Sequence, residues 1–323
     1  MDENSSQFPQ PIDTTPGLQP DDPIAEAGRK ILKHQYRMIR LFEQGVRAKE
    51  DIEALHKMRV AVRRMRIAYR VFRNYISREI IRPSIKELRE LGDALGDVRD
   101  LDVFLINAGN YKSNLIGEKQ IVFSLIEGTF ESKRKYHRRI LLELLNGQTY
   151  QGLCERLSEM LARSHGLVKD GKEQTTSSRT DVAAREIIRK RYEKILDFDR
   201  FSEKETIEKL HRIRIAVKAF RYSIEFFEEV LGNDARYVIE KLITLQDFLG
   251  ELNDRAVAVK MMEKNLLRSD FLDGHSDQVN SLATSYLESL GDDVKMRIEG
   301  FPSVWEIVHQ STFTSYIGKL FLL

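Results

Sequence analysis

The chain reads LHKMRVAVRRMRIAYRVF at residues 55–72 and LHRIRIAVKAFRYSIEFF at residues 210–227. Four histidine or basic positions recur in both copies: His56 and His211, Arg59 and Arg214, Arg63 and Lys218, and Arg66 and Arg221. A repeat of this length within one chain indicates duplication of a whole structural unit. The sequence therefore predicts two similar halves.

Long helices are predicted over nearly the whole chain. Hydrophobic residues make up 41% and charged residues 32%, a composition that suits long helices with a buried and a solvated face. Only 7 prolines occur, and most of them precede residue 24, so helix breakers are rare in the remainder. No stretch shows the alternation of a strand. We expect an all-α fold, a tandem duplication of two antiparallel four-helix bundles.

Changes in composition divide the chain into four parts. Residues 1–23 are rich in Pro and Ser and lack periodicity, so we predict a disordered tail. Residues 24–168 form the first half, and residues 169–180, which carry no large apolar residue, form a linker. Residues 181–323 form the second half, with Asp181 as a candidate N-cap. Pro83 is expected to separate the second and third helices of the first half.

Several classes of protein are disfavoured by composition. Cys154 is the single cysteine, which excludes a disulfide framework and a zinc cluster. The first residues lack a basic and an apolar region of the kind found in signal peptides. No apolar run approaches the roughly 20 residues that a membrane span needs. We expect a soluble cytoplasmic protein, and the net charge of only +2 means that any polyanion site requires a local concentration of charge.

A stripe of basic residues, without any acidic residue, runs along the first copy of the repeat. At 100° per residue, its members fall on an arc of about 100°: His56, Arg59, Arg63, Arg66, Arg70 and Arg73. Apolar residues border the arc on both sides, with Met58, Val62, Met65, Tyr69 and Phe72 on one flank and Val60, Ile67 and Val71 on the other. A solvated helix face is usually mixed in sign and lies opposite the core. The stripe is therefore predicted to lie in a recess between helices.

Repulsion within the stripe favours a bound anion. Four adjacent arginine pairs at about 0.2–0.5 kcal/mol each destabilise the helix by roughly 1–2 kcal/mol. The second copy places His211, Arg214, Lys218 and Arg221 on the same arc but continues with Glu225 and Glu228, so its basic patch is shorter. Two other interpretations remain open, namely a solvated face and pairing with buried carboxylates. His56 and His211 either donate hydrogen bonds to an anion or orient their own helix starts.

Other basic residues are candidates to join the site. They lie on the first helix of each half and on the fourth helix of the first half: Lys30, Arg37, Arg185, Arg189, Arg134 and Arg138. The cluster around Arg134 has no basic equivalent in the second half, so a solvated face explains it equally well.

Two carboxylate trios follow the repeats, Asp93, Asp97 and Asp100 in one half and Asp247, Glu251 and Asp254 in the other. Spacings of four and three residues put each trio on one helical face. Three roles are open: binding a divalent metal, acting as a catalytic pair, or neutralising and orienting the arginines of the stripe. We favour the last role because the helices are adjacent and their charges are complementary.

Duplicated LHxxRxAV(R/K)xxR helices, each followed by an LGDALGD-type helix, resemble the CHAD family, the conserved histidine α-helical domain. The resemblance covers about residues 24–323. It implies two four-helix bundles related by a pseudo-twofold axis, with a basic central groove or pore, and a protein that binds inorganic polyphosphate and associates with polyphosphate granules. The conserved histidines of the family fall on His56 and His211. Its basic positions fall on Arg59, Arg63, Arg66, Arg214, Lys218 and Arg221.

The resemblance and the stripe together predict a protein that binds inorganic polyphosphate or another phosphate-rich polyanion without catalysis, metal or cofactor. The stripe spans about 25 Å at 1.5 Å per residue, which suits several consecutive phosphates. The alternatives are a helical nucleic-acid-binding protein and a metal-dependent phosphohydrolase that uses the carboxylate trios. Single-stranded nucleic acid calls for exposed aromatic residues, whereas Tyr69, Phe72 and Phe220 are predicted to face the core. The oligomeric state stays open.

Overall fold

The computed structural model describes residues 15–48, 51–162, 178–199, 206–266 and 277–322. Within these ranges the regular structure is helical, apart from one isolated bridge between Pro23 and Arg179. The predicted all-α class is therefore confirmed. The helices of the first half are α1 (Ile24–Ala48), α2 (Ile52–Val71), α3 (Arg78–Ser113), α4 (Glu118–Asn146) and α5 (Gln148–Ala162).

The second half repeats the order of the first three helices. Its elements are α7 (Thr180–Leu196), α8 (Ile207–Phe226), the short α9 (Glu228–Leu231), α10 (Asn233–Leu266), α12 (Asp277–Trp305) and α13 (Ser311–Leu322), with 3-10 turns at Asp197–Asp199 and Glu306–His309. The repeated sequence stretches are α2 and α8, and the helices with the carboxylate trios are α3 and α10. Within the described residues each half thus has more helices than the four that were predicted, because α5 follows α4 after a break at Gly147 and the second half adds the short α9 and α13.

Two helix boundaries differ from prediction. The break between α2 and α3 lies at residues 72–77, and α3 continues through Pro83, which lies in its second turn. A proline so near a helix start removes only one backbone hydrogen bond from the helix, and 36 residues of packed helix outweigh that loss. Helix α7 begins at Thr180, so Asp181 lies inside its first turn and is not the N-cap.

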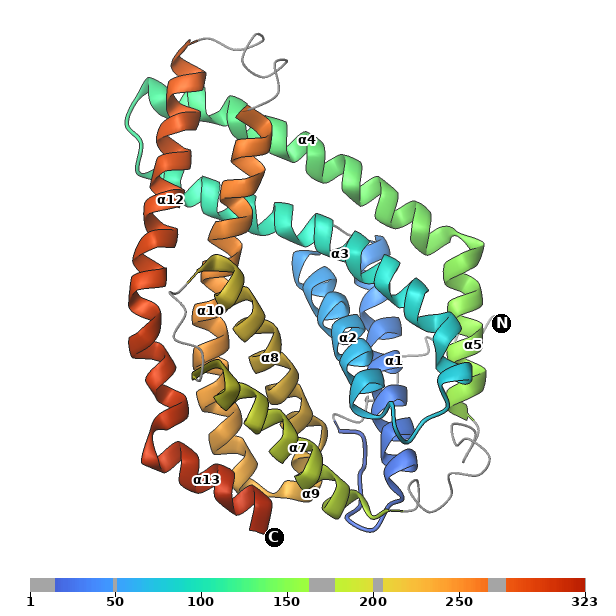
Figure 1. Cartoon of the computed structure of the whole chain (residues 1–323). Helices are drawn as coiled ribbons and strands as arrows, with labels where there is room; N and C mark the ends of the chain where they lie inside the picture. The colour runs from blue at the N-terminus through green and yellow to red at the C-terminus, as the bar shows by residue number, and fades with distance from the viewer. Residues whose placement is uncertain (1–14, 49–50, 163–177, 200–205, 267–276, 323) are drawn as a thin grey trace, which may run out of the picture.

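The hydrophobic core has two parts. The larger one lies among α1, α2, α3, α5, α7, α8, α10 and α13, with Leu141 and Leu145 from the end of α4 and Phe301 from the end of α12. The smaller one joins the ends of the long helices of both halves, and its residues come from α3, α4, α10 and α12. Figure 1 shows α3 and α4 crossing to the side where α10 and α12 lie. The halves are therefore not two independent bundles, since they share a distal core.

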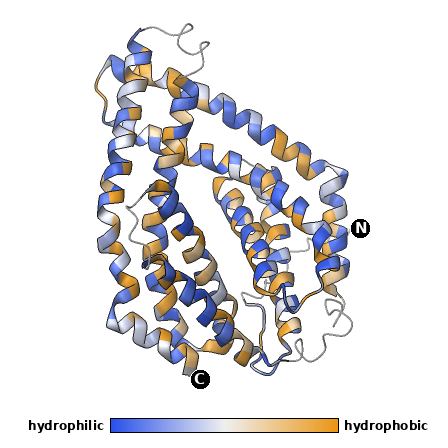
Figure 2. Cartoon of the chain, viewed as in Figure 1, coloured by the Kyte–Doolittle hydropathy of each residue, from blue (hydrophilic) through white to orange (hydrophobic). Residues whose placement is uncertain are grey.

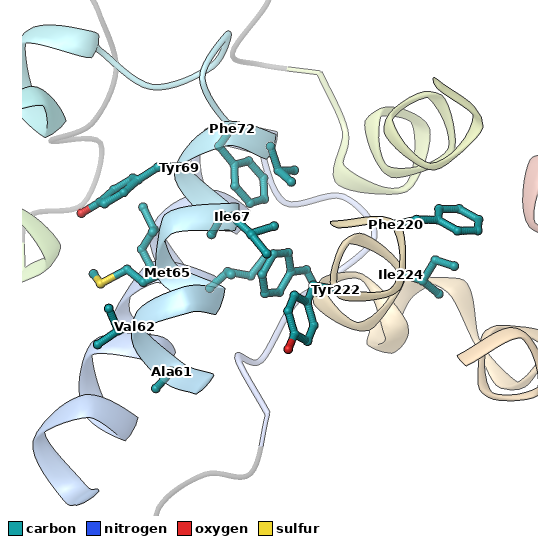
Figure 3. Packing of buried hydrophobic residues seen from close by; sticks show 14 of the residues in the cluster. Ala61, Val62, Met65, Ile67, Tyr69, Phe72, Phe220, Tyr222 and Ile224 are labelled. Carbon is teal, nitrogen blue, oxygen red and sulfur yellow. The ribbon is translucent and has the colours of Figure 1, made fainter. Parts of the chain in front are cut away.

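Helices α2 and α8 approach each other through their C-terminal parts and diverge toward their N-termini (Figure 1). Figure 3 shows Ile67 of α2 and Tyr222 of α8 between the two helices, while Phe220 lies on the far side of α8. Phe72 and Phe227 meet edge to face at 5.7 Å between ring centroids. Both repeated helices thus lie at the centre of the molecule, next to each other.

Residues 15–23 are ordered and connect the halves, which corrects the prediction of a disordered tail for this part. Gly17, at a φ of 75° that favours glycine, and Leu18 both donate their backbone N–H groups to the Glu229 carboxylate, at 3.1 and 2.9 Å. Thr180 in turn donates its N–H to the Asp22 carbonyl at 2.9 Å. The remainder of the predicted tail, residues 1–14, and linker residues 169–177 lie outside the described residues.

Apolar and polar residues alternate in short stripes along the helices, as Figure 2 shows. In the described part of the chain, no helix has the length and apolar character needed to cross a membrane.

Candidate anion-binding site

The basic stripe on α2 lies between two buried apolar flanks, as predicted. Met58, Val62, Met65 and Phe72 have no exposed surface, and Ile67 on the other flank is 3% exposed. The stripe residues between them are partly exposed at Arg59, Arg63 and Arg66 and more exposed at Arg70 and Arg73. The stripe residues therefore become more buried toward the N-terminal part of α2.

Arg59 and Arg63 of α2 face Arg214 and Lys218 of α8, and we call these four residues the shared cluster. Burial lowers the pKa of Lys218, and the positive charges of Arg63, Arg214 and Arg59 lower it further, to about 5. Burial likewise lowers the pKa of Arg214 to about 10, with Arg63 and Arg59 contributing in the same direction. Each half thus places two basic side chains within electrostatic reach of the other half.

Three nitrogen atoms of the repeated motif are buried without a hydrogen-bond partner among the described residues: His56 Nδ1, Arg63 Nε and Arg214 Nε. Burial, followed by the nearby charge of Arg99, lowers the pKa of His56, so its ring is held mainly neutral. A buried polar atom without a partner is destabilising by about 1–3 kcal/mol. Three such atoms in one motif are the arrangement expected around an anion that accepts their hydrogen bonds.

The carboxylate trios take part only through their last members. Arg59 lies 3.6 Å from Asp100, and Asp254 is the acidic group that partly offsets the positive charges around Arg214 and Lys218. Burial raises the pKa of Asp100 and outweighs the lowering effect of Arg59. Asp97 instead lies 3.3 Å from His137, and Glu251 pairs with Arg297 at 2.6 Å. The predicted neutralising role therefore fits Asp100 and Asp254 and not the whole trios.

Charge is balanced at the C-terminal end of the helix pair. Glu225 of α8 forms salt bridges with both Arg64 of α2 and Arg221 of α8. Arg64 also lies over the rings of Tyr222 and Phe226, at 5.2 and 5.4 Å. Glu228 pairs with Arg236. The shorter basic patch of the second half thus has a structural role, because Glu225 links the two repeated helices where they touch.

A family model described as the CHAD domain matches residues 30–263. The chain belongs to the CHAD domain family. A crystal structure of the CHAD domain from the plant Ricinus communis superimposes with a TM-score of 0.71 and 22% sequence identity, over 93% of this chain and 97% of the other. PptA from Streptomyces chartreusis gives a TM-score of 0.66 at 12% identity, over 87% of this chain and 99% of the other. Both likenesses concern the fold.

Sequence relatives of this CHAD domain occur in Mycobacterium tuberculosis. The uncharacterized protein Rv2226 of strain ATCC 25618 / H37Rv is 26% identical over 257 residues, which is 76% of this chain and 47% of the relative. The uncharacterized protein MT2285 of strain CDC 1551 / Oshkosh is 25% identical over the same length. The chain spans about half the length of the curated relatives that it matches.

The outer part of the stripe leads into a pocket of about 630 Å³ where α2 meets α3, which we call the corner pocket. Arg66 and Arg70 of α2, together with Arg73 just after the end of α2, line this pocket of the CHAD domain. Arg191 of α7 approaches from the second half. Burial lowers the pKa of Arg191, and the charges of Arg70 and Arg73 lower it further. The stripe thus continues from the shared cluster to a second concentration of positive charge.

The other predicted basic residues are not gathered at the shared cluster of the CHAD domain. Lys30 pairs with Asp22, Arg134 with Asp102, and Arg138 Nη2 donates to the Val46 carbonyl. Arg185 Nε donates to the Asp181 carbonyl, while Arg37 and Arg189 are exposed on the outer helices. His211 is exposed and its Nδ1 lies 3.1 Å from Asn253 Oδ1. Contacts to a loop, a helix end or a neighbouring helix account for Lys30, Arg134, Arg138 and Arg185.

Sequence reasoning missed four arginines near the stripe: Arg78, Arg82, Arg89 and Arg191. The first three line the corner pocket from α3. A signal for these arginines was present in the sequence, because one helical face carries Arg82, Ile85, Arg89, Gly92 and Gly96. In the structure this face meets α2, and Arg66 Nη1 lies 3.0 Å from where a Cβ of Gly92 would be. Arg191 carries no such signal because only the packing of α7 brings it there. Among the described residues, no group of three His, Cys, Asp or Glu is gathered as a metal site.

Proposed function

We propose that this CHAD domain binds inorganic polyphosphate, without catalysing its conversion, through the shared cluster and the α2 stripe. The observation that carries the proposal is the approach of Arg59 and Arg63 to Arg214 and Lys218, which brings basic residues of both halves to one place. Guanidinium groups present forked donors that match phosphate oxygens. A chain of phosphates offers many charges in a row, which suits a stripe better than a single anion would.

The buried nitrogen atoms support a bound anion over a solvated face. Arg63 Nε and Arg214 Nε are shielded from water and lack partners in the described part of the chain. Water satisfies the donors of a solvated face, whereas these buried donors favour an acceptor that binds between the helices. Phosphate oxygens are suitable acceptors because charge-assisted hydrogen bonds are about twice as strong as neutral ones.

Nucleic acid is the less favoured polyanion. Recognition of single strands uses exposed aromatic rings on which the bases stack. Tyr69, Phe72 and Phe220, the aromatic residues of the two repeats closest to the stripe in sequence, are at most 3% exposed. A phosphate chain without bases needs no such platform. Competition between long-chain polyphosphate and RNA of equal phosphate content will discriminate the two, and we expect polyphosphate to displace RNA.

The direct test is the double substitution Arg59→Ala with Arg63→Ala. It removes two charges from the shared cluster, and we expect affinity for long-chain polyphosphate to fall at least tenfold with helical content unchanged by circular dichroism. The matched control is Lys57→Ala with Lys86→Ala, which removes two charges from exposed positions on α2 and α3. Equal affinity of the double variant and the control variant would contradict the proposed site.

Salt and product measurements complete the test. Affinity is expected to fall steeply between 50 and 200 mM salt, because a polyanion releases counterions on binding, and the double variant is expected to show a shallower slope. Release of orthophosphate from polyphosphate with magnesium or manganese would instead establish the phosphohydrolase alternative. Association with polyphosphate granules follows from the same binding, because a granule presents many phosphate chains.

A further inference from the structure

The corner pocket differs from the shared cluster in its composition and in its origin. Six arginines of the first half line it, from α2, from the connection that follows α2 and from α3: Arg66, Arg70, Arg73, Arg78, Arg82 and Arg89. The second half has no equivalent, because Glu225 and Glu228 stand where α2 has Arg70 and Arg73. The pocket therefore belongs to one half only.

The corner pocket carries a large excess of positive charge, because six arginines and one carboxylate, Glu79, line it. Within the described part of the chain, the side chains of the six arginines form no ion pair and no hydrogen bond. The one carboxylate in the lining, Glu79, accepts a hydrogen bond from Ser77 Oγ at 3.0 Å. Burial and the charge of Arg66 lower the pKa of Arg70. Six positive charges around one pocket repel one another, and a multiply charged anion that binds there would offset that repulsion.

Two uncharged donors point to the same ligand. Tyr69 is one of the residues that line the pocket, and its hydroxyl is buried and has no hydrogen-bond partner among the described residues. Burial raises the pKa of Tyr69, so the group stays protonated and can donate. Helix α3 also begins here, and the side chain of its N-cap residue Ser77 makes no capping hydrogen bond. The N-terminus of a helix favours negative charge through its backbone N–H groups and its dipole.

We propose that the corner pocket is a separate site for the terminal phosphate groups of an oligophosphate, while the shared cluster holds the interior of a longer chain. The inference rests on the proposed function only in taking phosphate chains as the ligand class. The pocket volume of about 630 Å³ admits several phosphate groups together.

Terminal groups suit this pocket better than interior groups. A terminal phosphate, with a second pKa near 6, carries about −1.5 to −2 charges at neutral pH and offers three acceptor oxygens. An interior phosphate carries one charge and has two free oxygens. The lining supplies forked guanidinium donors in excess, together with a hydroxyl group and a helix N-terminus, so it matches the group with the larger charge and the larger number of acceptors.

The test uses Arg82→Gln with Arg89→Gln, which alters the corner pocket without touching the stripe or the shared cluster. The control is Lys86→Gln with Arg139→Gln, which removes two exposed charges elsewhere. With inorganic tripolyphosphate as the probe, calorimetry of the unaltered protein is expected to show two sites. The double variant should lose one of them, with at least a tenfold loss of affinity there. Unchanged affinity and unchanged stoichiometry in the double variant would overturn the proposal.

A second probe distinguishes two sources of terminal phosphates, namely the ends of long chains and free short oligophosphates. Long-chain polyphosphate is compared with the same chains whose ends are capped as phosphoramidates of a neutral amine. Tighter binding of the uncapped chains, lost in the double variant, assigns the pocket to chain ends. Equal binding of both chain types, with tripolyphosphate binding lost in the variant, assigns it to free short oligophosphates. Capped chains that bind normally to the Arg82 and Arg89 variant but poorly to the Arg59 and Arg63 variant show that the proposed function holds independently.

Tyr69→Phe provides a test that does not disturb the charge. The substitution removes only the hydroxyl oxygen from a side chain that is 3% exposed, so the fold should be retained. We expect a loss of tripolyphosphate affinity of about threefold or more at the corner pocket and none at the shared cluster. Equal affinity of the phenylalanine variant and the unaltered protein would show that the hydroxyl does not reach the ligand.

Discussion

At the scale of the single residue, Lys218 is the most unusual group of the shared cluster. Its counterpart in the first half is Arg63, which stays charged at every physiological pH. A lysine can instead lose its proton, and burial beside Arg63, Arg214 and Arg59 lowers the pKa of Lys218 to about 5. Asp254 of α10 opposes this shift. In the free protein Lys218 is therefore a neutral amine at pH 7, which reduces repulsion among the four basic residues.

Binding of a phosphate chain is expected to protonate Lys218, because a negative charge nearby favours the ammonium form. Affinity should then rise as pH falls from 8 to 6, by up to about tenfold per pH unit for one proton taken up. Calorimetry in two buffers of different ionisation enthalpy measures the proton count. Lys218→Arg should keep the binding and abolish most of the uptake.

His56 is the internal control for this experiment, since its pKa is also lowered and it lies near Arg59 and Arg63. Proton uptake that persists in Lys218→Arg and disappears in His56→Gln would reassign the effect to the histidine. In the unbound protein, Lys218 changes the free energy of unfolding in the opposite direction to a lysine in a salt bridge, because its pKa is lowered and not raised. The unfolded state binds more protons at Lys218 between pH 5 and the ordinary lysine pKa of 10.5, so this residue lowers stability increasingly as pH falls across that window.

At the scale of the element, the position of α2 depends on a close approach to α1. A Cβ on Gly45 would lie 2.6 Å from the Cβ of Ala54, which is too close for real side chains. Gly45→Ala is therefore expected to destabilise the protein by about 1–3 kcal/mol, as overpacking does. Thermal unfolding followed by circular dichroism measures the effect.

Gly250→Ala is the matched control for Gly45→Ala, because both glycines lie inside helices but nothing surrounds Gly250 within 4 Å. Alanine is favoured over glycine in a helix interior by about 1 kcal/mol, so this substitution should raise the melting temperature. A lower melting temperature for both variants would show that the close approach of α1 and α2 is not the cause.

Sequence patterns predicted the repeated helices well and their surroundings less well. The stripe on α2 and its apolar flanks follow from the helical period, which is a local property that residues 55–72 carry by themselves. The direction in which Asp93, Asp97 and Asp100 point depends on how α3 and α4 pack. The sequence therefore could not show which of the three carboxylates lies beside the stripe. The same holds for Pro83, whose effect on α3 is outweighed by packing along 36 residues. Arg191 reaches the stripe only through the contact of α7 with the first half.

At the scale of the whole molecule, the two halves are held together at three places. Helices α2 and α8 meet through Arg64, Glu225 and the Phe72–Phe227 ring pair. Residues 15–23 connect α1 with Glu229 and with the start of α7. The distal core is the third contact and joins α3 and α4 to α10 and α12. A site built from both halves requires such coupling, because the relative positions of α2 and α8 determine whether the shared cluster forms.

The distal core predicts that both halves unfold together. Phe104 of α3 packs against Phe130 of α4 and Tyr286 of α12, with ring centroids 3.9 and 6.1 Å apart. Phe104→Ala should lower stability by about 3–5 kcal/mol through the cavity that it leaves. Trp305, the single tryptophan, lies in the second half and donates a hydrogen bond to Asp199, so its fluorescence reports on that half. Urea unfolding followed by this fluorescence and by circular dichroism should shift equally in the variant, although Phe104 belongs to the first half. A shift seen by circular dichroism alone, with the Trp305 transition unmoved, would mean that the halves unfold separately and that the distal core does not couple them.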